Sequence, residues 1–600
     1  MRVTKSNFRH RFTRLFLLVA TLALVSTTAS AAHGRRKLAP DLSKFPTNSD
    51  GTIDVIIQFN QTPQARHFQM MASRGGRLKF SFKHINGAAY RIPARLLAWL
   101  ETHPDVAYVT PDRPTKAAWD DDVPAVMDDI ALQQFGVNGS GIGIAVIDSG
   151  VYQHNDLKNA NNTGSRIVYS ESFVPGDTST NDAYGHGTHV AGILAGNGHD
   201  SQSGYSQHYT GIAPNANIIN LRVLDAKGSG TDSRVIAAIQ RAIQLKDTYN
   251  IRIINISLGR GVFESYTDDP LCQAAEAAWR AGIVVVVAAG NSGRDNSMGT
   301  QGYATIQAPG NAPDVITVGA TKTNGTPSRL DDTVASYSSK GPTLLDHIVK
   351  PDIVAPGNRI VSLAAPGSTL VSGLLSLNVT GNPNCVLGIC IPGPSGKYTR
   401  LSGTSMATPI VAGAAALMLQ NDPTLTPDTV KARMMKTAWK GYPSNSWGHD
   451  RWGHGYFSQY DVFTIGAGYL DVYAALRNTD VATGGAASPI TTFNSATGQA
   501  TLVNGNSIVW GNSIIWGSTT IWADSIIWGS GIIEDPGDPA VETVVGGNAI
   551  VWGTTGVIGN VVIWADSIVW GDLPPDPPLD PPPGDDGTVG SFSDGEDGED

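Results

Sequence analysis

Three polar residues of this chain stand where their side chains could perform nucleophilic catalysis. Ser405 lies in Gly403-Thr404-Ser405-Met406-Ala407, just before the small apolar stretch 410–419, which is typical of a buried helix. A serine hydroxyl is inert at neutral pH and becomes a nucleophile only when a positioned base takes its proton. At the start of a helix its backbone N–H also points outward and could stabilise an oxyanion. Helix capping alone would explain such a serine, so the rest of the chain must decide its role.

The chain also carries a candidate base and a candidate acid. Asp148 ends the apolar stretch 143–147, which has the length of a buried strand, and a Ser-Gly turn follows it. His186 lies between two glycines at the start of another small-residue helix. Alone, either residue would be explained as a turn former or a structural histidine. Three such motifs in the order Asp, His, Ser are hard to obtain by chance.

At this level of detail the chain resembles the subtilisin-like serine peptidases, the subtilases of peptidase family S8, over about residues 137–476. The motifs that carry the resemblance are Val146-Ile147-Asp148-Ser149-Gly150, His186-Gly187-Thr188-His189-Val190-Ala191-Gly192, Val223-Leu224-Asp225, Ile254-Asn255-Ile256-Ser257-Leu258-Gly259, Ala288-Ala289-Gly290-Asn291 and Lys350-Pro351-Asp352-Ile353-Val354-Ala355-Pro356-Gly357.

The resemblance implies a role for each residue of the triad. Ser405 would attack the scissile carbonyl, His186 would take and return the proton, and Asp148 would hold the imidazole in its productive tautomer. The side-chain amide of Asn291 would be the second oxyanion donor, beside the Ser405 N–H. The alternative for Asn291 is a turn residue that closes the apolar stretch 283–289.

Substrate binding is also implied by the resemblance. The segments Gly228-Ser229-Gly230 and Ser257-Leu258-Gly259 match those between which the family adds an extended peptide as a strand. Gln307, in Gln307-Ala308-Pro309-Gly310-Asn311, aligns near the base of the specificity pocket and would make its floor polar. A glutamine in a surface loop is the alternative, and no preferred residue follows from it.

No cofactor is required for the implied reaction, but members of the family often bind structural calcium. Asp156 stands where many of them carry a ligand aspartate. Calcium needs several oxygen ligands. The companion loop, around 197–209, departs from the family pattern in length and composition, so Asp156 is only a candidate ligand.

The fold class follows from the alternation of apolar segments. Strand-like stretches at 218–224, 251–258 and 283–289 alternate with helical patterns at 233–246 and 270–281. This order predicts an α/β domain over 118–477 with a doubly wound parallel sheet, whose active residues gather at the carboxyl ends of the strands.

The first part of the chain has the organisation of a secreted precursor. Residues 1–31 combine basic residues, a short apolar run and Ala29-Ser30-Ala31, as in a signal peptide. Residues 49–115 predict a small α+β unit that resembles the ferredoxin-like inhibitory propeptide of the family. An unrelated adaptor domain is the alternative. Cleavage would fall within about 111–119, which would make the enzyme a self-processing zymogen.

Only three cysteines are present, which excludes a disulfide scaffold. Cys385 and Cys390 lie close together in an apparent insertion and could pair in an oxidising compartment. Cys272 is left over, and we expect it to be buried and unpaired.

The composition changes after Arg477, because the last 123 residues carry 17 acidic residues and neither Lys nor Arg. Tryptophans recur at six- and twelve-residue spacing over 505–571, which predicts a β-rich module of short strands stacked as a solenoid or hairpins. Its role could be surface attachment or packing on the catalytic domain. The Pro-rich and acidic residues 572–600 predict a disordered tail.

These observations together predict a secreted serine endopeptidase made as a zymogen. Its partners would be protein or peptide substrates and its own propeptide, with cell-surface attachment through the repeats as an option. The net charge of −10 argues against nucleic-acid binding, and no stretch is apolar and long enough for a stable membrane anchor. A processing protease of narrow specificity, or a non-catalytic surface or adhesion protein, are the alternatives.

Overall fold

The structure is a computed structural model of the full chain. It describes residues 36–117 and 134–494, with short gaps at 206, 327, 374–376, 382–383, 387–388, 392–395, 444, 451 and 483. Beyond residue 494 it describes only the backbone of short strands. The predicted signal peptide (1–31) and the predicted tail (572–600) therefore lie outside the described residues, as do residues 118 and 119 of the predicted cleavage region.

The centre of the molecule is an eight-stranded sheet in the order β14-β13-β12-β10-β6-β8-β7, with β15 paired to β13. Every pair in it is parallel except β13 with β14. The inner strands are almost continuous runs of buried Val and Ile, as expected for a parallel sheet covered on both faces. The strands are β6 (Gly143–Asp148), β7 (Ile167–Ser172), β8 (Asn217–Arg222), β10 (Ile251–Ile256), β12 (Val284–Ala288), β13 (Ile316–Lys322), β14 (Thr333–Val334) and β15 (Ile353–Pro356).

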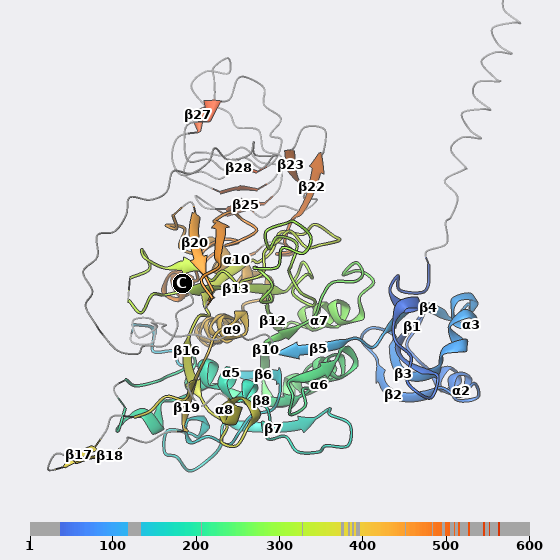
Figure 1. Ribbon diagram of the computed structural model, residues 1–600, viewed down its shortest axis with the longest axis horizontal. Helices are drawn as coiled ribbons and strands as arrows, with labels where there is room; N and C mark the ends of the chain where they lie inside the picture. Colours follow the sequence, from blue (N-terminus) through green and yellow to red (C-terminus); the bar gives the residue numbers. More distant parts are fainter. Residues whose placement is uncertain are drawn as a thin grey trace, which may run out of the picture.

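Helices pack around this sheet in two groups (Figure 1). In one, α5 and α9 contact each other, and α9 lies on β10, β12, β13 and β15; in the other, α6 and α7 contact each other and the sheet. The predicted α/β architecture with a parallel sheet is therefore confirmed. The helices are α5 (His186–Ala195), α6 (Asp232–Tyr249), α7 (Pro270–Arg280), α8 (Thr369–Gly373), α9 (Thr404–Asn421), α10 (Pro427–Thr437) and α11 (Val472–Arg477).

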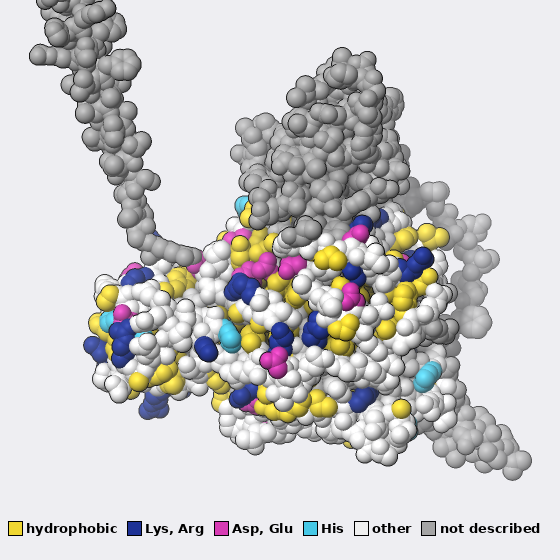
Figure 2. All heavy atoms as spheres, turned by 180° about the vertical axis from the view of Figure 1, so that it is seen from behind, with side chains coloured by type: hydrophobic (Ala, Val, Ile, Leu, Met, Phe, Trp, Pro, Cys, Tyr) yellow, Lys and Arg dark blue, Asp and Glu magenta, His cyan; other side chains and the backbone are white. Residues whose placement is uncertain are grey.

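An N-terminal lobe with its own hydrophobic core stands beside this body (Figures 1 and 2). Its antiparallel sheet has the order β2-β3-β1-β4, with a helix between β1 and β2 and another between β3 and β4. This is the β-α-β-β-α-β order of ferredoxin-like folds. Its elements are β1 (Thr52–Phe59), α2 (Ala65–Ala72), β2 (Arg77–Phe82), β3 (Gly87–Pro93), α3 (Leu97–Thr102) and β4 (Val106–Pro111), with 3-10 turns at Leu42–Lys44 and Ala94–Leu96.

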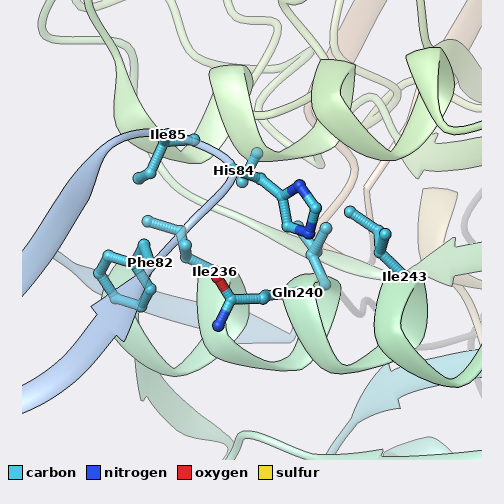
Figure 3. A pocket seen from close by; sticks show the side chains of 8 residues that line it. Phe82, His84, Ile85, Ile236, Gln240 and Ile243 are labelled. Carbon is cyan, nitrogen blue, oxygen red and sulfur yellow. The ribbon is translucent and has the colours of Figure 1, made fainter. Parts of the chain in front are cut away.

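The sheet of the N-terminal lobe rests on α6 and α7. Phe82 and Ile85 lie with Ile236 and Ile243 around a small apolar cavity at this contact (Figure 3). Beside it, the Gln240 side chain accepts from the Lys83 N–H and donates to the Ser81 carbonyl. A short strand, β5 (Pro114–Ala117), then leaves the lobe and enters the body (Figure 1).

Smaller pieces surround the main sheet. In the hairpin of β17 and β18, Cys385 faces Cys390 in register, but the side chains of both lie outside the described residues. Cys272 is buried and free, as predicted. The remaining elements are η3 (Asn155–Leu157), η4 (His199–Ser201), β9 (Ser229–Thr231), β11 (Leu258–Gly259), β16 (Ile360–Leu363), β17 (Asn384–Val386), β18 (Ile389–Ile391), β19 (Tyr398–Leu401), β20 (Asn445–His449), β21 (Gly455–Gln459), β22 (Ile490–Asn494) and β23 (Gln499–Val503).

The tryptophan repeats are described only as short strands. Trp516 and Trp528 are paired in parallel register, and so are Trp528 and Trp552. The side chains of this region lie outside the described residues, so a solenoid and its role stay predictions. The strands are β24 (Val509–Trp510), β25 (Ile514–Trp516), β26 (Ile526–Trp528), β27 (Val544–Val545), β28 (Val551–Trp552) and β29 (Val562–Ile563).

One face of the described residues is mixed in charge (Figure 2). On the face shown in Figure 2, Lys and Arg side chains are interspersed with Asp and Glu and form no continuous basic patch. Among the residues that the structure covers, no helix is both long and apolar enough to cross a bilayer.

Candidate active site

Asp148 and His186 are in direct contact at the carboxyl edge of the main sheet. Asp148 is the last residue of β6 and His186 the first of α5, and both are buried. The imidazole Nδ1 lies 2.8 Å from Oδ1 and 3.0 Å from Oδ2 of the carboxylate. A carboxylate only accepts, so Nδ1 carries the proton and Nε2 is the basic nitrogen. The close approach of α5 to the turn after β6 requires a glycine at position 187, since a Cβ there would lie 2.3 Å from the Gly150 carbonyl oxygen.

A second buried carboxylate, Asp182, holds the turn that leads to His186. It accepts from Ser149 Oγ at 2.8 Å, Gly185 N at 2.6 Å, and Thr188 N and Oγ1 at 2.8 and 2.7 Å. Burial raises the pKa of Asp182, against the lowering effect of these hydrogen bonds. Sequence reasoning missed this residue. One feature of the sequence could have indicated it: an acidic residue stands three positions before the glycine N-cap of α5. A glycine has no side chain to accept from the free N–H groups at the start of a helix, so a nearby carboxylate is needed.

Ser405 is the second residue of α9 and is fully buried. Its hydroxyl donates to the carbonyl oxygen of Ser257, at 2.8 Å, and the Ser257 hydroxyl donates to the carbonyl of Ser405, at 2.9 Å. Ser257 directly follows β10, so this exchange joins the first turn of α9 to the end of a central strand. In this state the hydroxyl points toward the segment predicted to bind substrate, and a rotation about the Cα–Cβ bond would redirect it.

Asn291 follows β12, at the same edge of the sheet. Its Oδ1 accepts from the backbone N–H and the hydroxyl of Thr404, both at 3.0 Å. A backbone N–H can only donate, so the acceptor end of the amide is fixed and Nδ2 points the other way. Nδ2 is buried with no hydrogen-bond partner among the described residues. An unsatisfied buried donor costs about 1–3 kcal/mol, and a substrate oxygen would remove that cost.

The two segments predicted to bind substrate flank a strand of the same chain. β5 lies between β9 and β11 and is antiparallel to both. Lys116 is in register with Ser229 on one side and with Gly259 on the other, and Ala117 faces Leu258. The full predicted set, Gly228, Ser229, Gly230, Ser257, Leu258 and Gly259, lies on β9 and β11 or directly before them.

Gln307 lies beside β11 and the turn that follows β12. A Cβ on Gly259 would be 2.9 Å from its Oε1, and one on Gly290 would be 2.7 Å from its Cγ. Its side chain thus fills the space between β11 and the turn that carries Asn291. Its role at the base of a specificity pocket stays a prediction.

Asp156 belongs to a cluster with His154 and Asp200, whose candidate ligand atoms lie within 4.8 Å of one another. The Asp156 carboxylate already accepts from the Tyr398 hydroxyl at 2.7 Å and from the Asp200 N–H at 2.8 Å. His154 Nδ1 accepts from the Asp156 N–H, and Nε2 lies 3.1 Å from a backbone carbonyl, so neither nitrogen offers a lone pair to a metal.

A lysine side chain supplies a positive charge at this cluster. The ammonium of Lys397 lies 3.2 Å from Asp200 Oδ2. Although burial acts in the opposite sense, hydrogen bonds from His199, Asn155 and Lys397 lower the pKa of Asp200 to about 2. Both carboxylates are thus engaged by protein donors, and neither His154 nitrogen is open, so the cluster fits calcium poorly and no role is assigned to a metal.

The profile of the subtilase family matches residues 139–468. The chain belongs to the subtilase family. It is 38% identical over 410 residues to serine protease AprX of Bacillus subtilis, covering 66% of this chain and 85% of that protein. It is 35% identical over 392 residues to subtilisin E of the same organism, covering 64% and 84%. The resemblance found in the sequence is confirmed, and the chain is a subtilisin-like serine protease.

The fold of this subtilase also resembles a solved structure, that of fervidolysin from Fervidobacterium pennivorans, a keratinolytic enzyme related to subtilisin. The TM-score is 0.51 at 20% identity, and the match covers 75% of this chain and 64% of the fervidolysin chain. At this identity the likeness concerns the fold alone.

Proposed function

We propose that the protein is a secreted serine endopeptidase that acts through an acyl-enzyme and is made as a self-processing zymogen. Ser405 is the nucleophile, His186 the general base and acid, and Asp148 the residue that orients the imidazole. The contact of Nδ1 with the Asp148 carboxylate supports this assignment because it leaves Nε2 as the proton acceptor. The Asn291 amide and the Ser405 N–H are the oxyanion donors.

The observation that carries the proposal is the position of β5. A peptide bound for hydrolysis by this family would add as a strand between β9 and β11, and β5 already occupies that place. The register puts Ala117 opposite Leu258, the residue that follows Ser257, and the carbonyl oxygen of Ser257 accepts from the Ser405 hydroxyl. We expect the cut to fall directly after this strand, at residue 118 or 119, inside the predicted range 111–119.

On this proposal the N-terminal lobe is an inhibitory propeptide. Its last strand fills the substrate site while it remains bound, so the enzyme is inactive until the connection is cut and the lobe leaves. The alternative of a non-catalytic adhesion protein is not favoured, since the chain retains the Asp148–His186 pair and an Asn291 amide donor that is free to bind an oxyanion. Surface attachment through the repeats stays a proposal for the tail alone.

The test compares the wild-type precursor with Ser405→Ala. The wild type should shorten to a form that begins at residue 119 or 120, as read by N-terminal sequencing, and should hydrolyse casein. The Ser405→Ala precursor should remain full length after signal removal and should be inactive. Equal maturation and equal casein hydrolysis by the two proteins would refute the proposal.

A further inference from the structure

Among the described residues, the side chains that hydrogen-bond to Glu264 all belong to the N-terminal lobe. It lies on the loop between β11 and α7 and is 3% exposed. Its carboxylate accepts from the hydroxyl of Tyr108 at 2.7 Å, the hydroxyl of Thr110 at 2.9 Å and the guanidinium of Arg113 at 2.6 Å. The catalytic body therefore contributes an acidic group to a contact whose donors all belong to the lobe.

Arg113 stands immediately before β5, the strand that fills the substrate site. Its side chain is only 1% exposed. On one side Glu264 accepts from its Nη1, and the ring of Phe263 lies 5.2 Å from its Cζ, within cation–π range. Its remaining donors, Nε and Nη2, go to Asp41 of the lobe at 3.0 and 2.8 Å. Glu264 and Phe263 are thus the part of this site that belongs to the catalytic body.

The loop that carries these two residues is held in place from the catalytic side. The guanidinium of Arg260 pairs with Asp232 at 2.9 Å and with Asp269 at 2.7 Å, all three buried. Asp269 in turn caps α7 by accepting from the Leu271 N–H. Because none of these contacts involves the lobe, the loop keeps its anchor after the lobe departs.

We propose that Glu264 and Phe263 form a subsite for a Lys or Arg side chain of protein substrates, placed directly before the residues that add to the sheet. The inference rests on the proposed function, in which β5 marks the path of a substrate. Strand addition fixes the register, so a substrate in the place of β5 presents the residue at the Arg113 position to the same carboxylate and ring. Removal of the lobe takes away the three donors of Glu264 and also Asp41, the competing partner of Arg113, so the Glu264 carboxylate becomes accessible to a cationic side chain of a substrate.

The experiment uses the mature enzyme and two internally quenched peptides. One repeats residues 112–121 of the chain, and the other replaces the arginine at the Arg113 position by citrulline, which keeps the shape and loses the charge. A charge-assisted hydrogen bond in a partly solvated site corresponds to about a tenfold difference in kcat/KM. We expect the wild type to favour the arginine peptide by about tenfold at low salt, and by less at 1 M NaCl.

Two variants localise the effect. Glu264→Gln should bring the arginine to citrulline ratio near one. Glu171→Gln is the matched control. Glu171 lies on β7, away from β5, and pairs with Arg241 of α6, so its variant should keep the wild-type ratio. Should the Glu264→Gln precursor fail to fold, the double variant Arg113→Gln, Glu264→Gln removes both partners of the buried pair, and its mature enzyme is identical to that of the single variant.

The outcomes separate the subsite from the proposed function. A ratio near one in the wild type, with both peptides cut, would overturn the subsite and leave the endopeptidase intact. A tenfold ratio that persists in Glu264→Gln would place the recognition elsewhere and would also overturn it. No hydrolysis of either peptide would refute the proposed function and the subsite that rests on it.

Discussion

Residues 478–494 follow the point where the composition of the chain changes, and their removal is the most informative perturbation of its architecture. Backbone hydrogen bonds join this segment to the catalytic body: Ser488 N–H to Pro313, Val349 N–H to the carbonyl of Pro489, and Thr491 N–H to His347. We therefore propose that the catalytic unit ends near Asn494, and not at Arg477. Truncation after Arg477 and truncation after Asn494 should then behave differently.

The expected loss can be worked from the contacts. The Ser488 hydroxyl lies in a buried cluster, where it bonds to the carboxylate of Asp352 and accepts from Lys431 Nζ at 3.0 Å. Burial and the repulsion of Lys431 lower the pKa of Lys350, in the same cluster, to about 7, although the Asp352 carboxylate opposes the shift. Loss of a hydrogen bond to a buried charge costs about 1.5–3 kcal/mol and each further bond about 1 kcal/mol. With one such loss counted for the Ser488 hydroxyl, whose two bonds share one group, and one bond for each of the three backbone contacts, truncation after Arg477 should cost about 4–6 kcal/mol.

This loss is large against the 5–15 kcal/mol that typically separates folded from unfolded states. At about 2–4 °C per kcal/mol it corresponds to a Tm lower by roughly 10–20 °C. The assay is thermal unfolding of the two truncated enzymes, each blocked by a serine-reactive inhibitor to prevent autolysis, with peptide hydrolysis measured before blocking. Ser488→Ala in the longer form should show about half of the effect. If the two truncations melt within 2 °C of each other, the segment is not part of the catalytic unit.

The remaining predictions concern the site and the charges around it. Asn291→Asp keeps the acceptor for Thr404 but loses the donor, so kcat should fall by at least about 10²-fold, as in subtilisin itself, with an unchanged Tm; a loss below tenfold would contradict the oxyanion role. Burial, and then the charge of Asp314, raises the pKa of Glu276 to about 7. Between pH 4.5 and 7 the folded state therefore binds more protons than the unfolded state, and the protein loses stability as the pH rises through this range. Glu276→Gln should thus unfold less readily than the wild type by about 1–3 kcal/mol at pH 8 and by much less at pH 5, whereas an equal gain at both pH values would exclude this cause. If Lys397 neutralises the Asp156 cluster, addition of EDTA should leave the Tm within about 2 °C, and a larger drop that calcium reverses would favour a metal in its place.

The parts of the site that could be predicted are those whose signal is local. The local sequence predicts a position at the carboxyl edge of a parallel sheet for three residues: Asp148 at a strand end, His186 between glycines and Ser405 at the start of a helix. That edge is where parallel strands end. The pairing of Nδ1 with the carboxylate then follows from two neighbouring elements, β6 and α5. Local order and topology were enough to predict the contact of Asp148 with His186, and the role of Ser405 beside them stays a prediction.

Contacts between distant segments could not be predicted in this way. Tyr398 donates to Asp156, which lies 242 positions earlier in the sequence. Its strand, β19, follows the apparent insertion that carries Cys385 and Cys390, and the local sequence does not indicate where such a strand will pack. The hydroxyl of Ser405 takes its direction from Ser257, because a rotamer depends on packing and not on a motif. Glu264 lies in a loop without any pattern, and its partners become visible only once the lobe is placed against it.

The same lobe also completes an element of the catalytic body. The N-cap of α6, Thr231, makes no capping hydrogen bond with its side chain. The carboxylate of Asp112 supplies that cap from the lobe, accepting from the Ser233 N–H at 2.9 Å and from the Ser233 hydroxyl at 2.7 Å. A helix cap of this kind contributes about 1 kcal/mol. Asp112 and Arg113 immediately precede β5, so one short stretch caps a central helix, holds Glu264 and lies between β9 and β11, where we propose that substrate binds. A cut after β5 would therefore remove the covalent tether that keeps all three contacts in place.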